Sequence, residues 1–197
     1  EADTFTIDTS GISLIGKDSG STIIDPPGES NTSGLYGILV STRVGVLVKN
    51  IGVTGAQTGI FFNDADRCTL NGDSVARVGA HGILLGYGSD TNTVTGCVSY
   101  QNTSNGIRWD GNSTTLTSNM ALSNGLAGIW LDNGRLNTIS NNTSNSNGGE
   151  GIHLEQATRN TISGNTCVSN TLSGIYVYLN SDTNVITNNT VQSNASN

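Results

Sequence analysis

The chain has 197 residues, of which 34% are hydrophobic, 12% charged and 5% aromatic, and its formal net charge at pH 7 is −7. This length allows one domain with its own core. The sequence contains only two Lys, so it lacks the positive charge needed to neutralise phosphates, and we expect no nucleic-acid partner. No run of 18 apolar residues occurs, so we expect no insertion into a membrane.

Residues 1–36 predict an irregular first coil of a repeating structure. Three apolar pairs in this segment predict short strands: Phe5 with Ile7, Ile12 with Leu14, and Ile23 with Ile24. The segment 25–36, DPPGESNTSGLY, contains both Pro residues of the chain together with Ser and Gly. Such a composition is typical of an irregular loop, which we expect to project just before the next strand.

From residue 37 to residue 197, one unit is repeated. A Gly-Ile pair recurs every 22 to 24 residues, at Gly37, Gly59, Gly82, Gly106, Gly128, Gly151 and Gly174. A second apolar residue follows two positions after each Ile, which is the spacing of side chains on one face of a strand. A further apolar row follows about ten residues on, from Val48 to Ile186. A fixed period in this range indicates structural units stacked on their neighbours.

Polar residues occupy the expected corners between strands. One row comes three residues after the last apolar row: Asp73, Cys97, Asn119, Asn142, Asn165 and Asn189. Another consists of Asn102, Asn124, Asn147, Asn170 and Asn194. Stacked Asn side chains can pass hydrogen bonds from coil to coil, so we expect asparagine ladders that satisfy the buried turn backbone.

These patterns predict an all-β fold, a single parallel β-helix domain over 1–197 with about eight coils of 22–24 residues. Seven regular coils are expected in 37–197. The unit 151–173, GIHLEQATRNTISGNTCVSNTLS, resembles the right-handed parallel β-helix superfamily that contains the pectin lyases. It is most similar to the carbohydrate-binding proteins and sugar hydrolases whose copies read GI.L.....N.I..N....N. The resemblance implies the right-handed fold and says little about activity, because one scaffold carries many kinds of site.

Two rows of outward-facing residues on the Gly-Ile strand form the candidate site. We name the first the central column: Leu39, Phe61, Leu84, Arg108, Trp130, His153 and Tyr176. We name the second the acidic row: Ser41, Asn63, Gly86, Asp110, Asp132, Glu155 and Tyr178. Aromatic and cationic groups beside carboxylates can stack on sugar rings and bind hydroxyls. The residues expected to bind a glycan are therefore Phe61, Arg108, Trp130, His153, Tyr176 and Tyr178. A solvated or assembly face is the alternative.

The same face supplies candidate catalytic residues, namely Arg108, Asp110, Asp132 and Glu155. Carboxylates one coil apart lie about 5 Å from each other at the backbone, which suits glycoside hydrolysis. In a lyase alternative that resembles the pectate lyases, Ca²⁺ binds the carboxylates and Arg108 is the base; otherwise we expect no metal or cofactor. The Asp-Pro-His motif of the alginate epimerases is absent, because Pro27 follows Asp25-Pro26. The absence of this motif favours a protein that is not an enzyme.

The sequence thus predicts a secreted or cell-surface module that binds polysaccharide or serves as a structural or adhesive rod. A polysaccharide lyase or glycoside hydrolase acting on the same face is the alternative, and a spike or filament subunit is a further one. The last coil has no capping element, so we expect a longer parent protein, or contacts with another copy through the open ends. Cys68, Cys97 and Cys167 fall at different repeat positions, and we expect buried side chains without a disulfide.

Overall fold

The computed structural model describes residues 4–26 and 34–196, which form 24 β-strands and no helix. The strands belong to three parallel sheets of eight strands each. Sheet A contains β1 (Phe5–Ile7), β4 (Tyr36–Ser41), β7 (Thr58–Asn63), β10 (Ile83–Leu85), β13 (Ile107–Trp109), β16 (Ile129–Asp132), β19 (Ile152–Glu155) and β22 (Ile175–Tyr178).

The other two sheets complete each coil. Sheet B contains β2 (Ser13–Ile15), β5 (Leu47–Lys49), β8 (Thr69–Asn71), β11 (Thr93–Thr95), β14 (Thr115–Thr117), β17 (Thr138–Ser140), β20 (Thr161–Ser163) and β23 (Val185–Thr187). Sheet C contains β3 (Ile23–Ile24), β6 (Gly52–Val53), β9 (Ser74–Ala76), β12 (Val98–Tyr100), β15 (Met120–Leu122), β18 (Thr143–Asn145), β21 (Thr166–Val168) and β24 (Thr190–Gln192).

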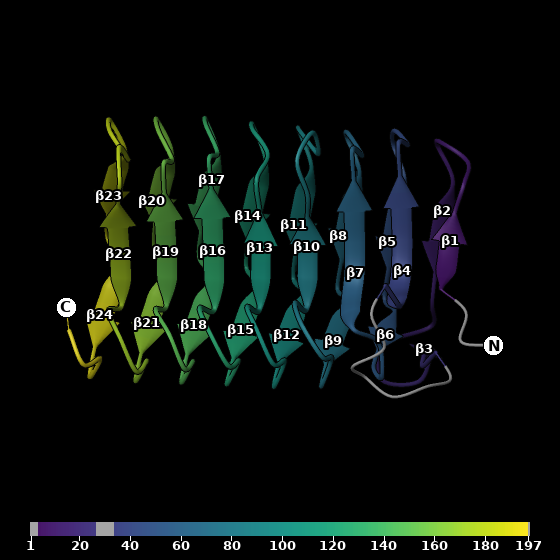
Figure 1. Cartoon of the computed structure of the whole chain (residues 1–197), viewed down its shortest axis with the longest axis horizontal. Helices are drawn as coiled ribbons and strands as arrows, with labels where there is room; N and C mark the ends of the chain where they lie inside the picture. The colour runs from purple at the N-terminus through teal and green to yellow at the C-terminus, as the bar shows by residue number, and fades with distance from the viewer. Residues whose placement is uncertain (1–3, 27–33, 197) are drawn as a thin grey trace.

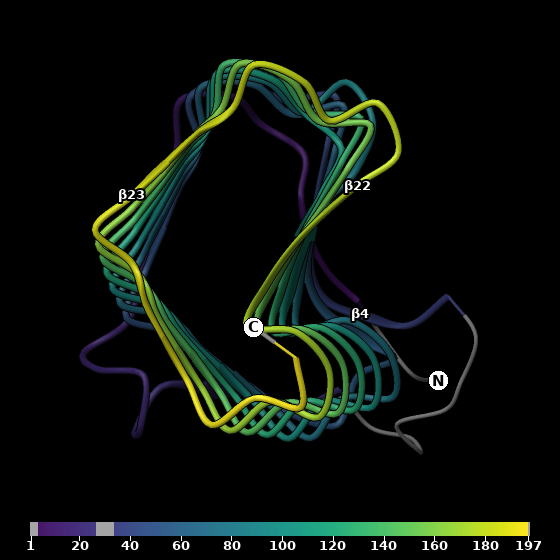
Figure 2. The same cartoon turned by 90° about the vertical axis from the view of Figure 1, so that its left-hand side faces the viewer.

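The coils are stacked side by side along the long axis of a rod (Figure 1). With the C-terminal end in front, the chain turns anticlockwise as it approaches the viewer, so the helix is right-handed (Figure 2). About seven turns separate β1 from β22. The predicted all-β, right-handed parallel β-helix is confirmed.

The apolar rows of the sequence form the core, as predicted. The Ile residues after each Gly are Cα partners from strand to strand in sheet A, and those from Ile38 to Ile152 are fully buried. Trp109, in the second apolar row, is the largest fully buried side chain. In the outermost coils the inward side chains stay partly exposed, as at Phe5, Val177 and Ile186, because no described coil covers them.

The corner asparagines bond from coil to coil. Asn142 accepts from the backbone N–H and the side-chain amide of Asn119, and donates to the Leu116 carbonyl and to Asn165 Oδ1. The second predicted row has the same pattern, for example between Asn147 and Asn170. A third row, which the sequence reasoning did not single out, occupies the corner between sheets A and B: Cys68, Asn92, Thr114, Asn137, Asn160 and Asn184.

Two local expectations concern particular segments. Most of the projecting loop predicted at 25–36 lies outside the described residues, and Tyr36 is already the first residue of β4. Cys68, Cys97 and Cys167 are buried free thiols, and burial raises the pKa of Cys97 and Cys167 to about 12. Within the described residues, no helix is long and apolar enough to cross a membrane.

Candidate functional site

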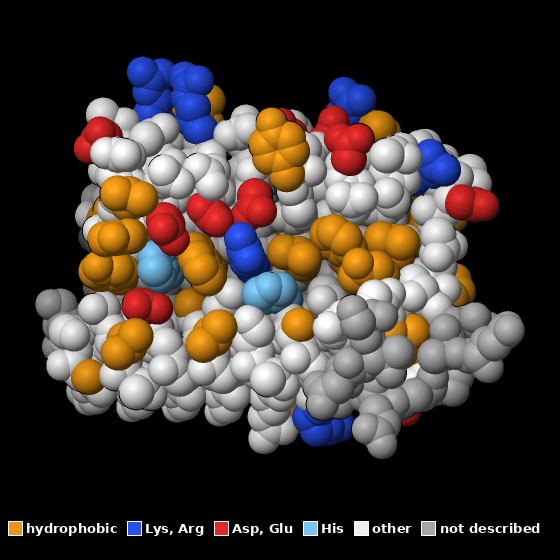
Figure 3. Space-filling model, viewed as in Figure 1, with side chains coloured by type: hydrophobic (Ala, Val, Ile, Leu, Met, Phe, Trp, Pro, Cys, Tyr) orange, Lys and Arg blue, Asp and Glu red, His pale blue; other side chains and the backbone are white. Residues whose placement is uncertain are grey.

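The central column and the acidic row lie on the outer face of sheet A. Arg108, Trp130, His153 and Tyr176 are successive Cα partners on β13, β16, β19 and β22. Asp132, Glu155 and Tyr178 are aligned in the same way. Figure 3 shows this face, with a band of hydrophobic and His side chains and acidic side chains along one side of it. The alignment follows from the repeat, since residues at equal positions in successive coils lie one strand apart.

The backbone bends inward at this sheet. In cross-section the corners on either side of sheet A project beyond it (Figure 2). Beside the central column the surface is hollowed next to Trp130 and His153.

Stacking within the central column covers both faces of the Trp130 ring. The Arg108 guanidinium carbon lies 4.9 Å from the Trp130 ring centroid. On the other side, the His153 ring lies 5.1 Å from Trp130 with an interplanar angle of 21°. Both faces of the Trp130 indole are covered, so the ring presents its edge outward. A sugar ring cannot stack face to face on Trp130 in this arrangement, which differs from the predicted stacking strip.

The exposed aromatic faces lie at the C-terminal end of the column. Tyr176 meets His153 edge-on, at 84° and 5.2 Å, and stacks on Tyr178 at 15° and 5.7 Å. Tyr176 is 37% exposed and Tyr178 46% exposed. Phe61 is separated from Arg108 by Leu84 on β10 and packs instead against Tyr36, 5.1 Å away. The two tyrosines thus lie on the last described strand of sheet A, and Phe61 belongs to a separate cluster.

Arg108 links the column to the acidic row. Its Nη2 lies 3.0 Å from Asp132 Oδ2, and its Nε lies 3.6 Å from Asp110 Oδ1. Burial raises the pKa of the Asp110 carboxyl, an effect that Arg108 opposes and Asp132 reinforces. The structure therefore brings three of the four candidate catalytic residues into one ion-paired cluster, with Glu155 on the next strand.

His153 is placed between two glutamates. Its Nδ1 lies 3.4 Å from Glu150 Oε2 and its Nε2 lies 3.9 Å from Glu155 Oε2. Sequence reasoning missed Glu150, because it precedes the strand in the turn before Gly151. With Glu150 included, the face carries two carboxylates beside Arg108, those of Asp110 and Asp132, and two beside His153, those of Glu150 and Glu155.

His81 lies beside the column on the coil before Arg108. Burial, with a smaller contribution from the Arg108 charge, lowers the pKa of His81 to about 4. Its imidazole is therefore neutral at neutral pH. Its Nδ1 lies 3.4 Å from the amide nitrogen of Asn105, which holds the ring in place.

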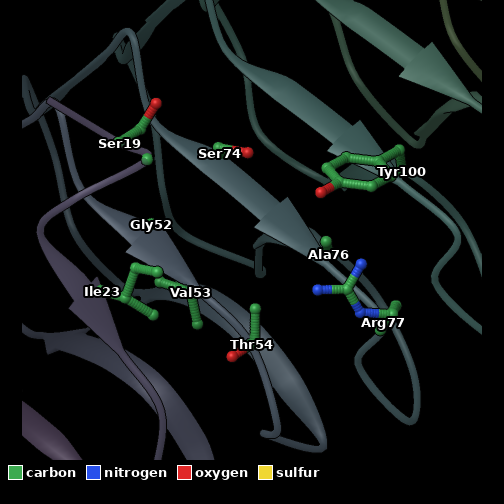
Figure 4. A pocket seen from close by; sticks show the side chains of 10 residues that line it. Ser19, Ile23, Gly52, Val53, Thr54, Ser74, Ala76, Arg77 and Tyr100 are labelled. Carbon is green, nitrogen blue, oxygen red and sulfur yellow. The ribbon is translucent and has the colours of Figure 1, made fainter.

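Besides a hollow of about 350 Å³ among Ile175, Val177 and Ile186 on the last coil, two hollows open on the surface of the described residues. One, of about 230 Å³, adjoins the central column and is lined by Trp130, His153, Leu126, Leu172, Ala127, Asn105, Gly148, Gly149 and Glu150. The other, of about 220 Å³, lies on the outer face of sheet C and shares no residue with the first. Figure 4 shows it between Ser19 and Ile23 on one side and Arg77 and Tyr100 on the other. Only the first hollow is continuous with the predicted site.

The solved structures that resemble this chain show its fold. The periplasmic alginate epimerase AlgG is 20% identical with a TM-score of 0.68, over 73% of this chain and 35% of the epimerase. The A-module of the Azotobacter vinelandii mannuronan C-5 epimerase AlgE6 is 15% identical with a TM-score of 0.56, over 89% of this chain and 60% of the module. The enzymatically active domain of tailspike protein 2 from bacteriophage CBA120 is 11% identical with a TM-score of 0.58, over 89% of this chain and 33% of that domain.

The chain spans between about a third and three fifths of the length of these structures. No curated protein sequence matches it. A family model does: the one described as "Periplasmic copper-binding protein (NosD)" matches residues 6–197. This chain therefore belongs to the NosD family of right-handed parallel β-helix proteins.

Proposed function

We propose that this chain is a carbohydrate-binding β-helix module that works outside the cytoplasm. The observation that carries the proposal is the outer face of sheet A, where aromatic side chains that include Tyr176 and Tyr178 lie in register beside the Arg108–Asp132 ion pair. Carboxylates and a guanidinium are strong partners for sugar hydroxyls. The named relatives support a glycan ligand, since two are epimerases of alginate or mannuronan. The family description and AlgG support a periplasmic location.

Copper, which the family description names, does not fit the donors present in this chain. Copper sites use Cys, Met and His side chains. His81, just before β10, and His153, on β19, lie three coils apart, Met120 lies on sheet C, and the cysteines are buried in three different coils. Among residues 4–26 and 34–196, no group of three or more His, Cys, Asp or Glu side chains could hold a metal ion. We therefore assign no copper-dependent step to this chain.

A glycan array tests the proposal. We expect the wild-type chain to bind at least one polysaccharide, and Tyr176→Ala combined with Tyr178→Ala to weaken binding by about fivefold or more, because loss of stacking costs about 1–3 kcal/mol for two rings. Tyr100→Ala is the matched control, since this ring lies on sheet C beside the second hollow. Binding that is lost in the control and kept in the double variant would move the site to sheet C and refute the proposal.

The second candidate function is a glycoside hydrolase on the same face. It is favoured by one observation, the raised pKa of Asp110 next to Asp132, which suits a general acid beside a second carboxylate. The lyase role of Arg108 as base is less well supported, because its guanidinium already lies in ion pairs with Asp110 and Asp132. Release of reducing ends by the wild-type chain, abolished by Asp110→Asn, would establish the hydrolase; a binding module releases none.

A further inference from the structure

We propose that the hollow beside Trp130 and His153 binds the ammonium group of an amino sugar, and that the Glu150 carboxylate is its partner. The inference rests on the proposed glycan-binding function and narrows the ligand class. The ligand is then a glycan that carries free, protonated amino groups, such as a hexosamine polymer without acetyl groups.

Glu150 carries acceptor oxygens that the fold leaves free. It lies in the turn before β19 and lines the hollow together with Leu126, Leu172 and the two rings. Its side chain is only 16% exposed, and its contact with a described side chain is the one from Oε2 to His153 Nδ1, at 3.4 Å. Within residues 4–26 and 34–196 its carboxylate accepts no hydrogen bond. A carboxylate placed in this way can accept from several donors of a ligand.

The hollow exists because one coil lacks a side chain. The backbone N–H of Gly149 donates to the Leu126 carbonyl, and the N–H of Leu172 donates to the Gly149 carbonyl, so these residues are stacked in successive coils. Leu126 is 49% and Leu172 47% exposed, and Gly149 leaves a gap between them. A Cβ on Gly149 would lie 2.9 Å from the Ala127 nitrogen. The volume of about 230 Å³ suits an amino group with the ring atoms next to it.

The charge of the face favours a cation. Four carboxyl groups stand against one guanidinium and one imidazole: Asp110 and Asp132 beside Arg108, and Glu150 and Glu155 beside His153. Two carboxyl groups therefore remain in excess even when the imidazole is protonated. The corner residues Arg135 and Arg159 follow β16 and β19, at the opposite ends of these strands from the hollow. An ammonium group supplies three donors and a positive charge, whereas a uronate would add a further negative one.

Hydroxyl groups of the same sugar also have partners here. Trp130 Nε1 and His153 Nε2 are buried nitrogens without a hydrogen-bond partner among the described residues, and both side chains line the hollow. The indole nitrogen is a donor only, so it suits a sugar oxygen and not an ammonium group. The amino group thus belongs at Glu150. An amino sugar differs from its hydroxyl counterpart in the charge that it brings to this carboxylate, and not in being the only group that can bond.

Oligosaccharides of one linkage that differ in a single substituent test the inference. We would measure dissociation constants for oligomers of glucosamine, N-acetylglucosamine and glucose, in a mildly acidic buffer of low ionic strength that keeps the sugar amines protonated. We expect glucosamine oligomers to bind about tenfold or more tightly than both others, because the bond to Glu150 is charge-assisted. This preference should shrink as salt is added. Oligouronates, with and without Ca²⁺, should bind more weakly than glucose oligomers.

Variants locate the effect. Glu150→Gln keeps the shape of the side chain and removes its charge, so we expect it to abolish most of the preference for glucosamine while glucose oligomers bind as before. Asp64→Asn is the matched control, because it changes the net charge equally at an exposed corner after β7 and has a positive φ that Asn tolerates. The preference should be unchanged in this control. An oligolysine of equal charge tests for unspecific attraction and should bind more weakly than the glucosamine oligomer.

The outcomes separate this inference from the proposed function. Equal affinity for glucosamine and glucose oligomers, a preference kept in Glu150→Gln, tighter binding of oligouronates, or oligolysine binding as tightly as glucosamine oligomers would overturn the inference alone. The wild-type comparison and its salt dependence provide the test even when the variant fails to fold. If no glycan of any class binds, the proposed function itself is wrong.

Discussion

Asp73 makes the stability of the rod depend on pH. It takes the place of a corner Asn, is fully buried, and accepts hydrogen bonds from the backbone N–H groups of Ile51 at 2.9 Å and Asn71 at 3.0 Å. Burial raises the pKa of its carboxyl from 3.8 to about 6, although both bonds act in the opposite direction. Ionisation of the Asp73 carboxyl is therefore less favourable in the folded chain than in the unfolded chain.

The sign and size of the effect follow from linkage. Because the folded pKa lies above the unfolded one, the folded chain holds the proton more tightly between pH 3.8 and about 6. The contribution of Asp73 to stability is fully present below pH 3.8 and is lost as the pH rises through 6. The difference between the two pKa values corresponds to about 3 kcal/mol in the free energy of unfolding.

The substitution Asp73→Asn removes this dependence and restores the side chain found in other coils. Loss of the bond from Asn71 has a cost of about 1–3 kcal/mol, but that cost is the same at every pH. The free energy of unfolding of the variant, relative to the wild type, should therefore increase by about 2.5 kcal/mol between pH 4 and pH 8.

Urea unfolding from pH 4 to pH 8, followed by the fluorescence of buried Trp109, measures this difference. The matched control is Asp182→Asn, which changes an exposed corner carboxyl and should give a nearly constant difference. A difference for Asp73→Asn that stays within about 1 kcal/mol over this range, or that falls with pH, would refute the reasoning.

Two further predictions concern the scaffold. Asn142→Ala removes four side-chain hydrogen bonds and should lower the free energy of unfolding by about 3 kcal/mol in urea titrations; an unchanged midpoint contradicts this. Gly151→Ala brings a Cβ to 2.5 Å from the Gly174 carbonyl oxygen, so its melting temperature should fall clearly; a melting temperature equal to that of the wild type means that the backbone shifts freely.

The scaffold was predictable because each coil repeats the same requirements. Apolar residues two apart face inward in every coil, so the order of the sheets follows from counting. The corner between sheets A and B is only partly visible in the sequence, where Cys68 replaces the Asn seen at Asn92 and Asn160, because its row is mixed and also contains Thr114. Chemically different side chains fill one hydrogen-bonding role there, and a search for a single residue type does not find them.

The candidate site was predictable only in its placement. The repeat determines that Trp130 and His153 point outward on adjacent strands, but it does not determine ring orientation, which depends on packing against Arg108. Glu150 lies in a turn whose path no strand period describes. The hollow beside Trp130 is visible in the sequence, because aligning the coils places Gly149 between Leu126 and Leu172.

The indole N–H signal of Trp130, followed by nuclear magnetic resonance while a glycan identified on the array is added, tests the central claim most directly. Trp109 provides an internal reference, because it is fully buried in the core of the next coil. The account predicts a saturable shift of the Trp130 signal, and of the His153 ring signals, with the Trp109 signal unchanged. Saturable binding that leaves both Trp130 and His153 unmoved would contradict it.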